Sequence, residues 1–214
     1  MLDAIGCTEM SAMLRGAAAQ IRDNHELLGK LDSVGGDGDH GITMVRAMSH
    51  LEKAVDAASG KDLKSLLHDV GWGILGVDGG ATGPLLGMFF MGMSEAAEDI
   101  ETLDALGLTD AFEAGLAGVR AQTKAQPGDK TMVDALVPAV MAAGCAAEDG
   151  GDLLSVLRDA ANAAAAGAAA TKDMQARFGR ARNIKELSIG TPDAGATSVS
   201  LIFAGFLKGV EANG

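Results

Sequence analysis

Aromatic residues are scarce in this sequence, which has no Tyr, one Trp and six Phe among its 214 residues. Aromatic side chains favour β-strands, whereas Ala, which is abundant here, is the strongest helix former and the smallest residue that can face a core. Almost no stretch shows the polar and apolar alternation of a half-buried strand. The composition therefore predicts closely packed helices rather than sheets.

Basic residues are also few: 17 Lys and Arg stand against 29 Asp and Glu, which gives a formal net charge of -12. A surface with this excess of negative charge repels phosphate backbones and anionic lipid headgroups. The charge argues against nucleic acid and membranes as partners.

Cysteines and long apolar runs are nearly absent. Cys7 and Cys145 form neither a disulfide framework nor a metal-binding spacing, so we expect a protein of the reducing cytoplasm. The N-terminus lacks the basic and then apolar pattern of a secretory signal. The alanine-rich stretch at 163–170 is too short and too weakly apolar for a membrane span, and it is typical of a buried helix.

The chain does contain repeated helical spacing of apolar residues, and 48% of it is hydrophobic, enough for a sizeable core. Pro138 interrupts one helical stretch, but the periodicity continues beyond it, which predicts a kink rather than an end. No internal repeat or change of composition marks a second domain, so we expect one domain over residues 1–214. The expected helices number about eight, at Met10–Leu28, Met44–Val55, 61–75, 84–98, 109–124, 131–148, 152–176 and 197–210.

Gly accounts for 30 residues, about twice its usual share of ~7%. It is concentrated in four connectors between the predicted helices. Connectors hold the backbone positions that need unusual dihedral angles or close approach to a ligand, so function tends to lie there. The connectors are Gly35–Gly41, Gly79–Gly83, Pro127–Lys130 and Gly190–Gly195.

The first connector, with the residues before it, carries three carboxylates: Asp32, Asp37 and Asp39. Neighbouring carboxylates repel one another unless a hard cation such as Mg²⁺ lies between them. The helix that resumes at Ile42 offers free N–H groups and a positive dipole end, which suit a phosphate. The pattern therefore indicates a combined metal and phosphate site.

Other interpretations of this connector can be weighed on the sequence. Its glycines match G-x-G-x-x-G, but no strand precedes them, which argues against a dinucleotide-binding fold. A calcium-binding EF-hand beginning at Asp37 would need an acidic residue where Met48 stands. An ordinary solvated Asp-Gly turn stays open.

The remaining connectors carry weaker signals. Thr82, among glycines before an apolar helix, offers a hydroxyl to a phosphate. Lys130 is not preceded by the Gly of a P-loop, so a phosphate contact, a helix-cap neighbour and an ion pair with Asp129 all stay open. Arg180 could supply a cation to a nucleotide. Each connector is also compatible with a plain turn or helix cap. His40 is the one His inside a candidate site, where donation to a phosphate is favoured over a general-base role.

Taken together, these segments resemble the nucleotide-binding DhaL-type subunit of dihydroxyacetone kinase. The order and spacing of the motifs and the chain length all agree with that family, over nearly the whole sequence. The matching segments are Asp32–Gly41, Gly79–Leu85, Pro127–Met132, Met174–Arg177 with Gly179–Ala181, and Asp193–Ser198.

The resemblance implies an all-α barrel of eight antiparallel amphipathic helices. It also implies two Mg²⁺ ions held by Asp32, Asp37 and Asp39, bridging the phosphates of ADP or ATP. Thr123 stands where the family commonly has Gly, Ala194 where it usually has Pro, and Arg182-Asn183-Ile184 where Ser-Tyr-Leu is typical. The positions that match nucleotide contacts are His40, Gly41, Ile42, Thr43, Ala81, Thr82, Thr123, Met132, Arg180, Asp193, Ala194 and Gly195.

By the same resemblance, the protein is a phosphotransferase subunit that passes phosphoryl from bound ATP to a ketose. The ketose is held on a separate subunit, because the family's sugar-binding half has no room in this sequence. ADP would stay bound as a cofactor and be recharged by a protein of the phosphotransferase system. The alternatives are an ATP-exchanging kinase subunit for another triose or tetrulose, and a non-catalytic, nucleotide-loaded regulatory partner. The oligomeric state, a homodimer included, stays open.

Overall fold

α-Helices form almost all of the regular structure in the computed structural model, which describes residues 2–212. Within these residues, extended pairing is limited to one isolated bridge between Ile5 and Leu103. The expectation of an all-α fold is confirmed. The helices are α1 (Cys7–Asp23), α2 (His25–Asp32), α3 (His40–Asp56), α4 (Leu63–Leu75), α5 (Thr82–Ala96), α6 (Ala105–Gln122), α7 (Val133–Glu148), α8 (Leu153–Ala170) and α9 (Ala194–Glu211), with 3₁₀ segments at Thr171–Asp173 (η1) and Arg180–Ser188 (η2).

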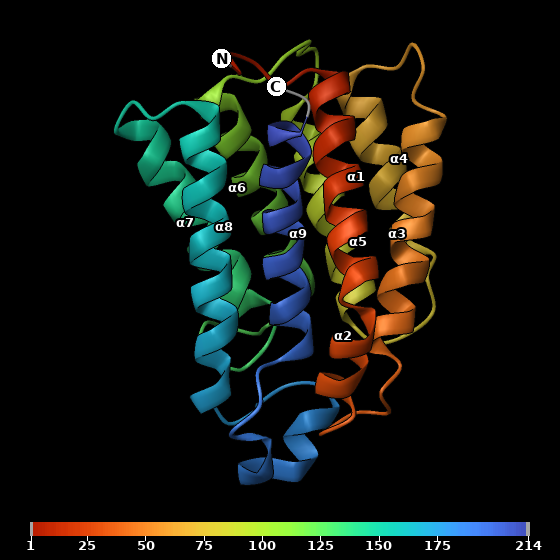
Figure 1. Ribbon diagram of the computed structural model, residues 1–214, viewed down its shortest axis with the longest axis vertical. Helices are drawn as coiled ribbons and strands as arrows, with labels where there is room; N and C mark the ends of the chain where they lie inside the picture. The colour runs from red at the N-terminus through yellow and green to blue at the C-terminus, as the bar shows by residue number, and fades with distance from the viewer. Residues whose placement is uncertain (1, 213–214) are drawn as a thin grey trace.

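Eight of these helices close into a ring in the order α1, α3, α4, α5, α6, α7, α8 and α9, and α9 packs again on α1. They run up and down along the long axis of the molecule (Figure 1). This is the expected barrel of about eight helices. The predicted helix Met10–Leu28 breaks at Asn24, so the short α2 is an additional helix below α1. α7 continues through Pro138, as its periodicity predicted.

The up-and-down order places alternate connectors at the same end of the barrel. Those between α2 and α3, α4 and α5, α6 and α7, and α8 and α9 lie at the lower end in Figure 1, opposite the two chain termini. The four glycine-bearing connectors of the sequence are these four. The topology therefore brings together segments that are more than a hundred residues apart in the chain.

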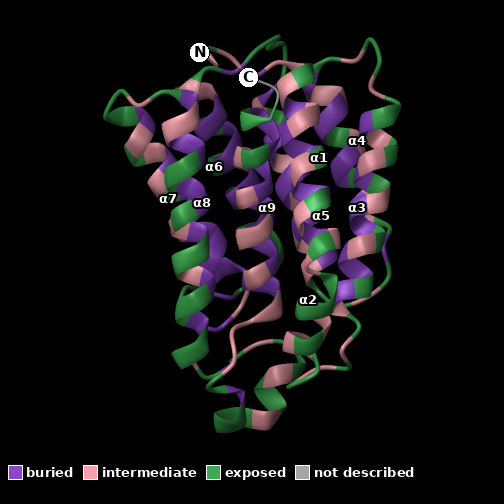
Figure 2. Ribbon diagram, in the orientation of Figure 1, coloured by how far each residue is buried: buried purple, intermediate pink, exposed green. Residues whose placement is uncertain are grey.

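The interior of the ring is apolar, and most buried positions face inward (Figure 2). Its centre holds a cluster of aromatic rings whose centroids lie 5.3 to 6.5 Å from their neighbours. Among the described residues, no helix is both long enough and apolar enough to cross a membrane. The clustered rings are Phe89, Phe90, Phe112, Phe203 and Phe206.

Glycine is also a helix-packing residue in this fold. At Gly16 of α1, an added Cβ would lie 2.1 Å from the carbonyl oxygen of Gly205 in α9, and at Gly205 it would lie 2.4 Å from Cα of Ala17. The two backbones therefore touch, which no larger side chain permits. More than half of the described glycines lie inside helices, so the sequence-based emphasis on connectors accounted for only part of the glycine excess.

Three of the helices that begin at the upper end are capped by aspartate. Asp62, Asp104 and Asp152 precede α4, α6 and α8, and each carboxylate accepts a hydrogen bond from the backbone N–H three residues on. These caps satisfy one of the N–H groups that a helix start leaves unpaired. α3 and α5, which begin at the lower end, have no side-chain cap, and these two uncapped starts matter for the site.

Candidate functional site

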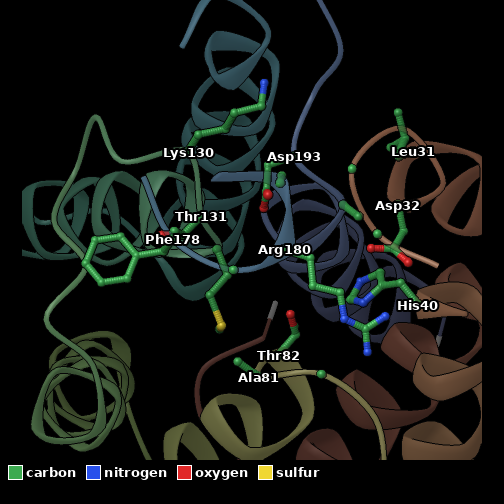
Figure 3. A pocket seen from close by; sticks show the side chains of 18 of the residues that line it. Leu31, Asp32, His40, Ala81, Thr82, Lys130, Thr131, Phe178, Arg180 and Asp193 are labelled. Carbon is green, nitrogen blue, oxygen red and sulfur yellow. The ribbon is translucent and has the colours of Figure 1, made fainter. Parts of the chain in front are cut away.

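The four lower connectors surround one pocket of about 300 Å³ (Figure 3). Residues from Leu31 to Thr43, Gly79 to Leu85, Thr123 to Val133 and Phe178 to Gly195 contribute to its wall. Every helix of the ring except α1 ends or begins at one of these connectors. A ligand in the pocket would therefore contact most of the barrel at once.

Three carboxylates gather at one corner of the pocket. Asp32, Asp37 and Asp39 each offer an oxygen, and the three oxygens lie within 4.8 Å of one another. Oxygens bound to a common Mg²⁺ at about 2.1 Å would stand up to about 4.2 Å apart, so this set needs only a slight contraction to hold the ion. Hard carboxylate oxygens are also the chemical type that Mg²⁺ prefers.

The backbone of this loop is shaped around Asp32, the last residue of α2. Its Oδ2 accepts a hydrogen bond of 2.9 Å from the N–H of Gly38, which has a φ of 77°. A Cβ at Gly36 would lie 2.3 Å from Oδ1 of Asp32. Glycine at these two positions therefore lets the loop fold tightly enough to bring the three carboxylates together.

A cation from the other side of the pocket already faces this corner. The Arg180 guanidinium, at the start of η2, forms an ion pair with Asp37. The hydrogen bond from Arg180 lowers the pKa of the Asp37 carboxyl below its usual value. Arg180 is thus within reach both of the carboxylate corner and of any anion bound beside it, as Figure 3 illustrates with Asp32 and His40 nearby.

Two helix starts lie beside the pocket. α3 begins beside the carboxylate loop and α5 begins at Thr82, and neither has a side-chain cap. Before Thr82 the chain passes through Gly79 and Gly80, both with positive φ. A Cβ at Gly79 would lie 2.6 Å from Oγ1 of Thr43. Uncapped starts with positive dipole ends, next to a cation site, suit a polyphosphate.

His40 links α3 to α9. Its Nε2 lies 2.8 Å from Oγ of Ser198, which in turn lies 3.1 Å from the carbonyl oxygen of Ala194. Burial lowers the pKa of His40, which favours the neutral imidazole. A Ser198 hydroxyl that donates to Ala194 accepts the hydrogen bond from His40. His40 therefore ties the metal loop to the start of α9, in addition to lining the pocket.

The start of α9 forms the opposite wall. Asp193 caps the helix through a 2.7 Å hydrogen bond from the N–H of Ala196, and burial raises the pKa of its carboxyl to about 6. A Cβ at Gly195 would stand 3.1 Å from Oγ1 of Thr82 and 3.5 Å from Cβ of Met132. Three connectors thus meet at van der Waals distance around Gly195.

The structure brings most of the predicted site residues to this pocket, with two exceptions. An added Cβ at Gly41 would lie 2.0 Å from the carbonyl oxygen of His25, so its Cα faces the backbone of α2. Ile42 is 56% exposed on the outer face of α3. Neither lines the pocket, because the first turn of α3 directs them elsewhere. Those that do line it are Asp32, Asp37, Asp39, His40, Thr43, Ala81, Thr82, Thr123, Met132, Arg180, Asp193, Ala194 and Gly195.

Several pocket residues were not among the sequence-based candidates. Phe178, Ile184 and Ser188 line the wall from the segment between α8 and α9. The sequence predicted a helix as far as residue 176, but α8 ends at Ala170 and the chain continues through η1 and η2. Since this segment has no regular periodicity, the sequence alone gave no signal of which side chains turn inward.

Comparison with known proteins places this arrangement in a family. Residues 34–208 match the DAK2 domain. The chain belongs to the DAK2 domain family. Within that family, its resemblance to DhaL-type subunits of dihydroxyacetone kinase is confirmed by two bacterial relatives. The ADP-binding subunit DhaL of PEP-dependent dihydroxyacetone kinase 1 from Listeria innocua is 40% identical over 189 residues, which cover 88% of this chain and 89% of the relative.

The corresponding Escherichia coli subunit, also named as ADP-binding, is 40% identical over 174 residues, which cover 81% of this chain and 83% of the relative. The D-erythrulose kinase of Mycolicibacterium smegmatis is 37% identical and is covered over 32% of its length. A crystal structure of the C. freundii dihydroxyacetone kinase in complex with AMP-PNP and Mg²⁺ matches with a TM-score of 0.71 and 26% identity, over 92% of this chain and 33% of that one.

Proposed function

We propose that this chain forms a single nucleotide-binding domain and serves as the ADP/ATP-binding subunit of a dihydroxyacetone kinase. It would transfer phosphoryl from bound ATP to a ketose held on a separate subunit. The observation that carries the proposal is the carboxylate corner of Asp32, Asp37 and Asp39 in a pocket with two uncapped helix starts. The names of the DhaL relatives, which are ADP-binding subunits, support it.

The three aspartates of the carboxylate corner are the residues that would hold the metal. We propose that they hold two Mg²⁺ ions. When bound, Mg²⁺ neutralises charge on the phosphates during transfer. The structure of the C. freundii relative with AMP-PNP and Mg²⁺ supports this combination of ligands. In this chain, Gly36 and Gly38 keep the loop tight enough for the carboxylates to act together.

The protein's own groups bind and orient the nucleotide. Arg180 would exchange its ion pair with Asp37 for one with a phosphate oxygen. The hydroxyl of Thr82 and the N–H groups at the starts of α3 and α5 would donate hydrogen bonds to the phosphates. Met132 would offer apolar contact. Phosphoryl transfer asks the protein mainly to position charges, with little covalent work. We assign nucleotide contact to His40, Thr43, Ala81, Thr82, Thr123, Met132, Arg180, Asp193, Ala194 and Gly195.

The donor that recharges the nucleotide is inferred from the relatives. The L. innocua and E. coli subunits belong to PEP-dependent kinases, and a Lactococcus lactis relative, 36% identical, to a PTS-dependent one. These subunits are matched over more than four-fifths of their length, the erythrulose kinases over about a third. We therefore propose a resident ADP recharged by a phosphotransferase-system protein, with exchange of free ATP as the alternative.

Reconstitution tests the proposal. The purified chain is mixed with a ketose-binding subunit of a PEP-dependent dihydroxyacetone kinase, Mg²⁺ and dihydroxyacetone, and ketose phosphate is measured with either ATP or a PEP-driven phosphotransferase system as donor. We expect product with the phosphotransferase system and little turnover with ATP. Product with ATP alone would favour the exchanging kinase. No product with either donor, despite bound nucleotide, would favour a regulatory role and contradict the kinase assignment.

A further inference from the structure

Lys130 is a buried cation in the connector between α6 and α7. It is only 5% exposed, and burial lowers the pKa of its amine. Its φ of 60° is unusual for a residue with a side chain. A lysine in such a position needs strong contacts to offset the cost of burial and of the backbone conformation.

Its contacts reach across to the segment that precedes α9. Nζ of Lys130 donates to the carbonyl oxygen of Thr171 at 2.6 Å and to that of Thr191 at 2.5 Å. The first carbonyl belongs to η1, directly after α8, and the second lies two residues before the cap of α9. One ammonium group therefore joins both ends of the long α8–α9 connector to the α6–α7 connector.

The backbone around Lys130 is itself held firmly. Asp134, which is 5% exposed, accepts hydrogen bonds from the N–H of Gly128 at 2.5 Å and of Thr131 at 2.7 Å. Asp129 accepts one from the N–H of Gln126 at 2.8 Å. The lysine thus extends from a rigid turn, and its amine has a defined position.

The parts that Lys130 joins include the pocket wall at the start of α9. Close to the Thr191 contact, the N–H of Asp193 donates to Oγ1 of Thr171 at 2.8 Å. Two residues further, Gly195 packs against Thr82 and Met132. Displacement of residues 191–193 would therefore move the wall that Gly195 forms with the other connectors.

We infer that Lys130 is a positioning residue, which holds the start of α9 in register with the rest of the pocket so that the nucleotide fits. The inference rests on the proposed function, since it assumes that the pocket binds a nucleotide. The sequence left open a phosphate contact for Lys130, and the geometry does not support that role. In Figure 3 the amine of Lys130 points away from the corner formed by Asp32, His40 and Arg180.

The test compares Lys130→Met, which keeps the length of the side chain but removes its charge, with Lys172→Met, which changes an exposed lysine beside Thr171. For Lys130→Met we expect the Kd of Mg-ADP to rise by about tenfold, the effect of losing hydrogen bonds to a charged group. In the reconstituted kinase driven by the phosphotransferase system, the ADP concentration that gives half the maximal rate should rise with it, while the rate at saturating ADP stays within about threefold. Lys172→Met should match the wild type.

Two further measurements separate positioning from a general loss of structure. Binding of Mn²⁺ without nucleotide should be unchanged in Lys130→Met, because the carboxylate corner lies on a different connector. Hydrogen exchange should accelerate at the amides of residues 193–196 and not in the buried turns of α5 or α6. Uniformly faster exchange, or an unchanged Kd for Mg-ADP, would overturn the inference.

If Lys130→Met does not fold, Thr171→Val serves as a second variant. It removes the hydroxyl that accepts a hydrogen bond from the N–H of Asp193, and it keeps the hydrogen bonds from Lys130 to the two carbonyl oxygens. It should weaken Mg-ADP in the same way, and normal affinity would count against the positioning role. If the wild type itself binds no Mg-ADP, the proposed function fails. Hydrogen exchange at residues 193–196 then still decides whether Lys130 holds the start of α9.

Discussion

Two groups of aspartates in this chain serve different purposes, and the contacts of their side chains tell them apart. Asp62, Asp104 and Asp152 accept hydrogen bonds from the helix that each one precedes. Asp37 and Asp39 do not cap a helix start in this way, and with Asp32 they turn toward one another. Three like charges this close are costly without a counter-charge, so their proximity is the strongest residue-level sign of a cation site.

Asp193 combines both situations, because it caps α9 and also lies, partly buried, in the pocket wall. Its pKa of about 6 lies above the ordinary value of about 3.9. The folded state therefore holds this proton more tightly than the unfolded chain, and stability is lost as the pH rises from about 4 through 6.

Asp193→Asn removes this titration and keeps a residue that caps helices well. Between pH 4 and 7, the free energy of unfolding of the variant should improve relative to the wild type by up to about 3 kcal/mol. Urea unfolding of the nucleotide-free proteins across this range measures the difference. If the unfolding free energies of Asp193→Asn and the wild type ran parallel across this pH range, Asp193 would have an ordinary pKa and the prediction would be wrong. Asp110→Asn, at an exposed position of α6, should give a profile parallel to that of the wild type.

At the scale of the elements, helix packing depends on glycine where α1 meets α9. Gly205→Ala would place a Cβ within 2.4 to 2.5 Å of the backbone of Gly16 and Ala17. We expect a loss of about 1–3 kcal/mol in the free energy of unfolding, as for overpacking elsewhere. Gly144→Ala in α7 is the matched control, because its nearest neighbour is a side-chain oxygen at 3.8 Å.

The control should be stabilised by about 0.5–1 kcal/mol through the higher helix propensity of Ala. Thermal or denaturant unfolding of both variants gives the comparison. Equal effects of the two substitutions would mean that α1 and α9 do not touch as closely as the structure shows.

The sequence predicted the helices well where apolar residues recur with helical spacing. It did not predict the break at Asn24, because the apolar pattern runs through it from Ile21 to Leu28. It also missed the end of α8, because alanine continues as far as Ala170 and residues 171–176 carry no strong breaker. Periodicity reports which face is buried and says little about where a backbone turns.

For the pocket, the sequence indicated the residues that cluster in one connector, such as the three aspartates and the glycines with Thr82. It could not show that Gly41 faces α2, since that depends on how two helices meet. Nor could it choose among the roles of Lys130, because the carbonyls of Thr171 and Thr191 are 41 and 61 residues away in the chain. Contacts of this kind follow from the closed barrel and not from local pattern.

At the scale of the whole molecule, metal ions would reconcile the net charge of -12 with the polyphosphate ligand that we propose. Asp32, Asp37 and Asp39 add to the negative charge and, by our assignment, are also the groups that allow a nucleotide to bind. A nucleotide without a divalent cation should be repelled by the acidic corner of the pocket, with Arg180 as the main cation to oppose the repulsion.

Calorimetric titration of ADP into the nucleotide-free protein, with Mg²⁺ and then with a chelator in its place, tests the metal-bridged site most directly. We predict binding with Mg²⁺, none with the chelator, and an affinity weakened roughly 10- to 100-fold in Asp37→Asn through loss of one charged ligand. Asp110→Asn should bind as the wild type does. Equal affinity for ADP with and without Mg²⁺, or an unchanged affinity in Asp37→Asn, would contradict the metal-bridged nucleotide site.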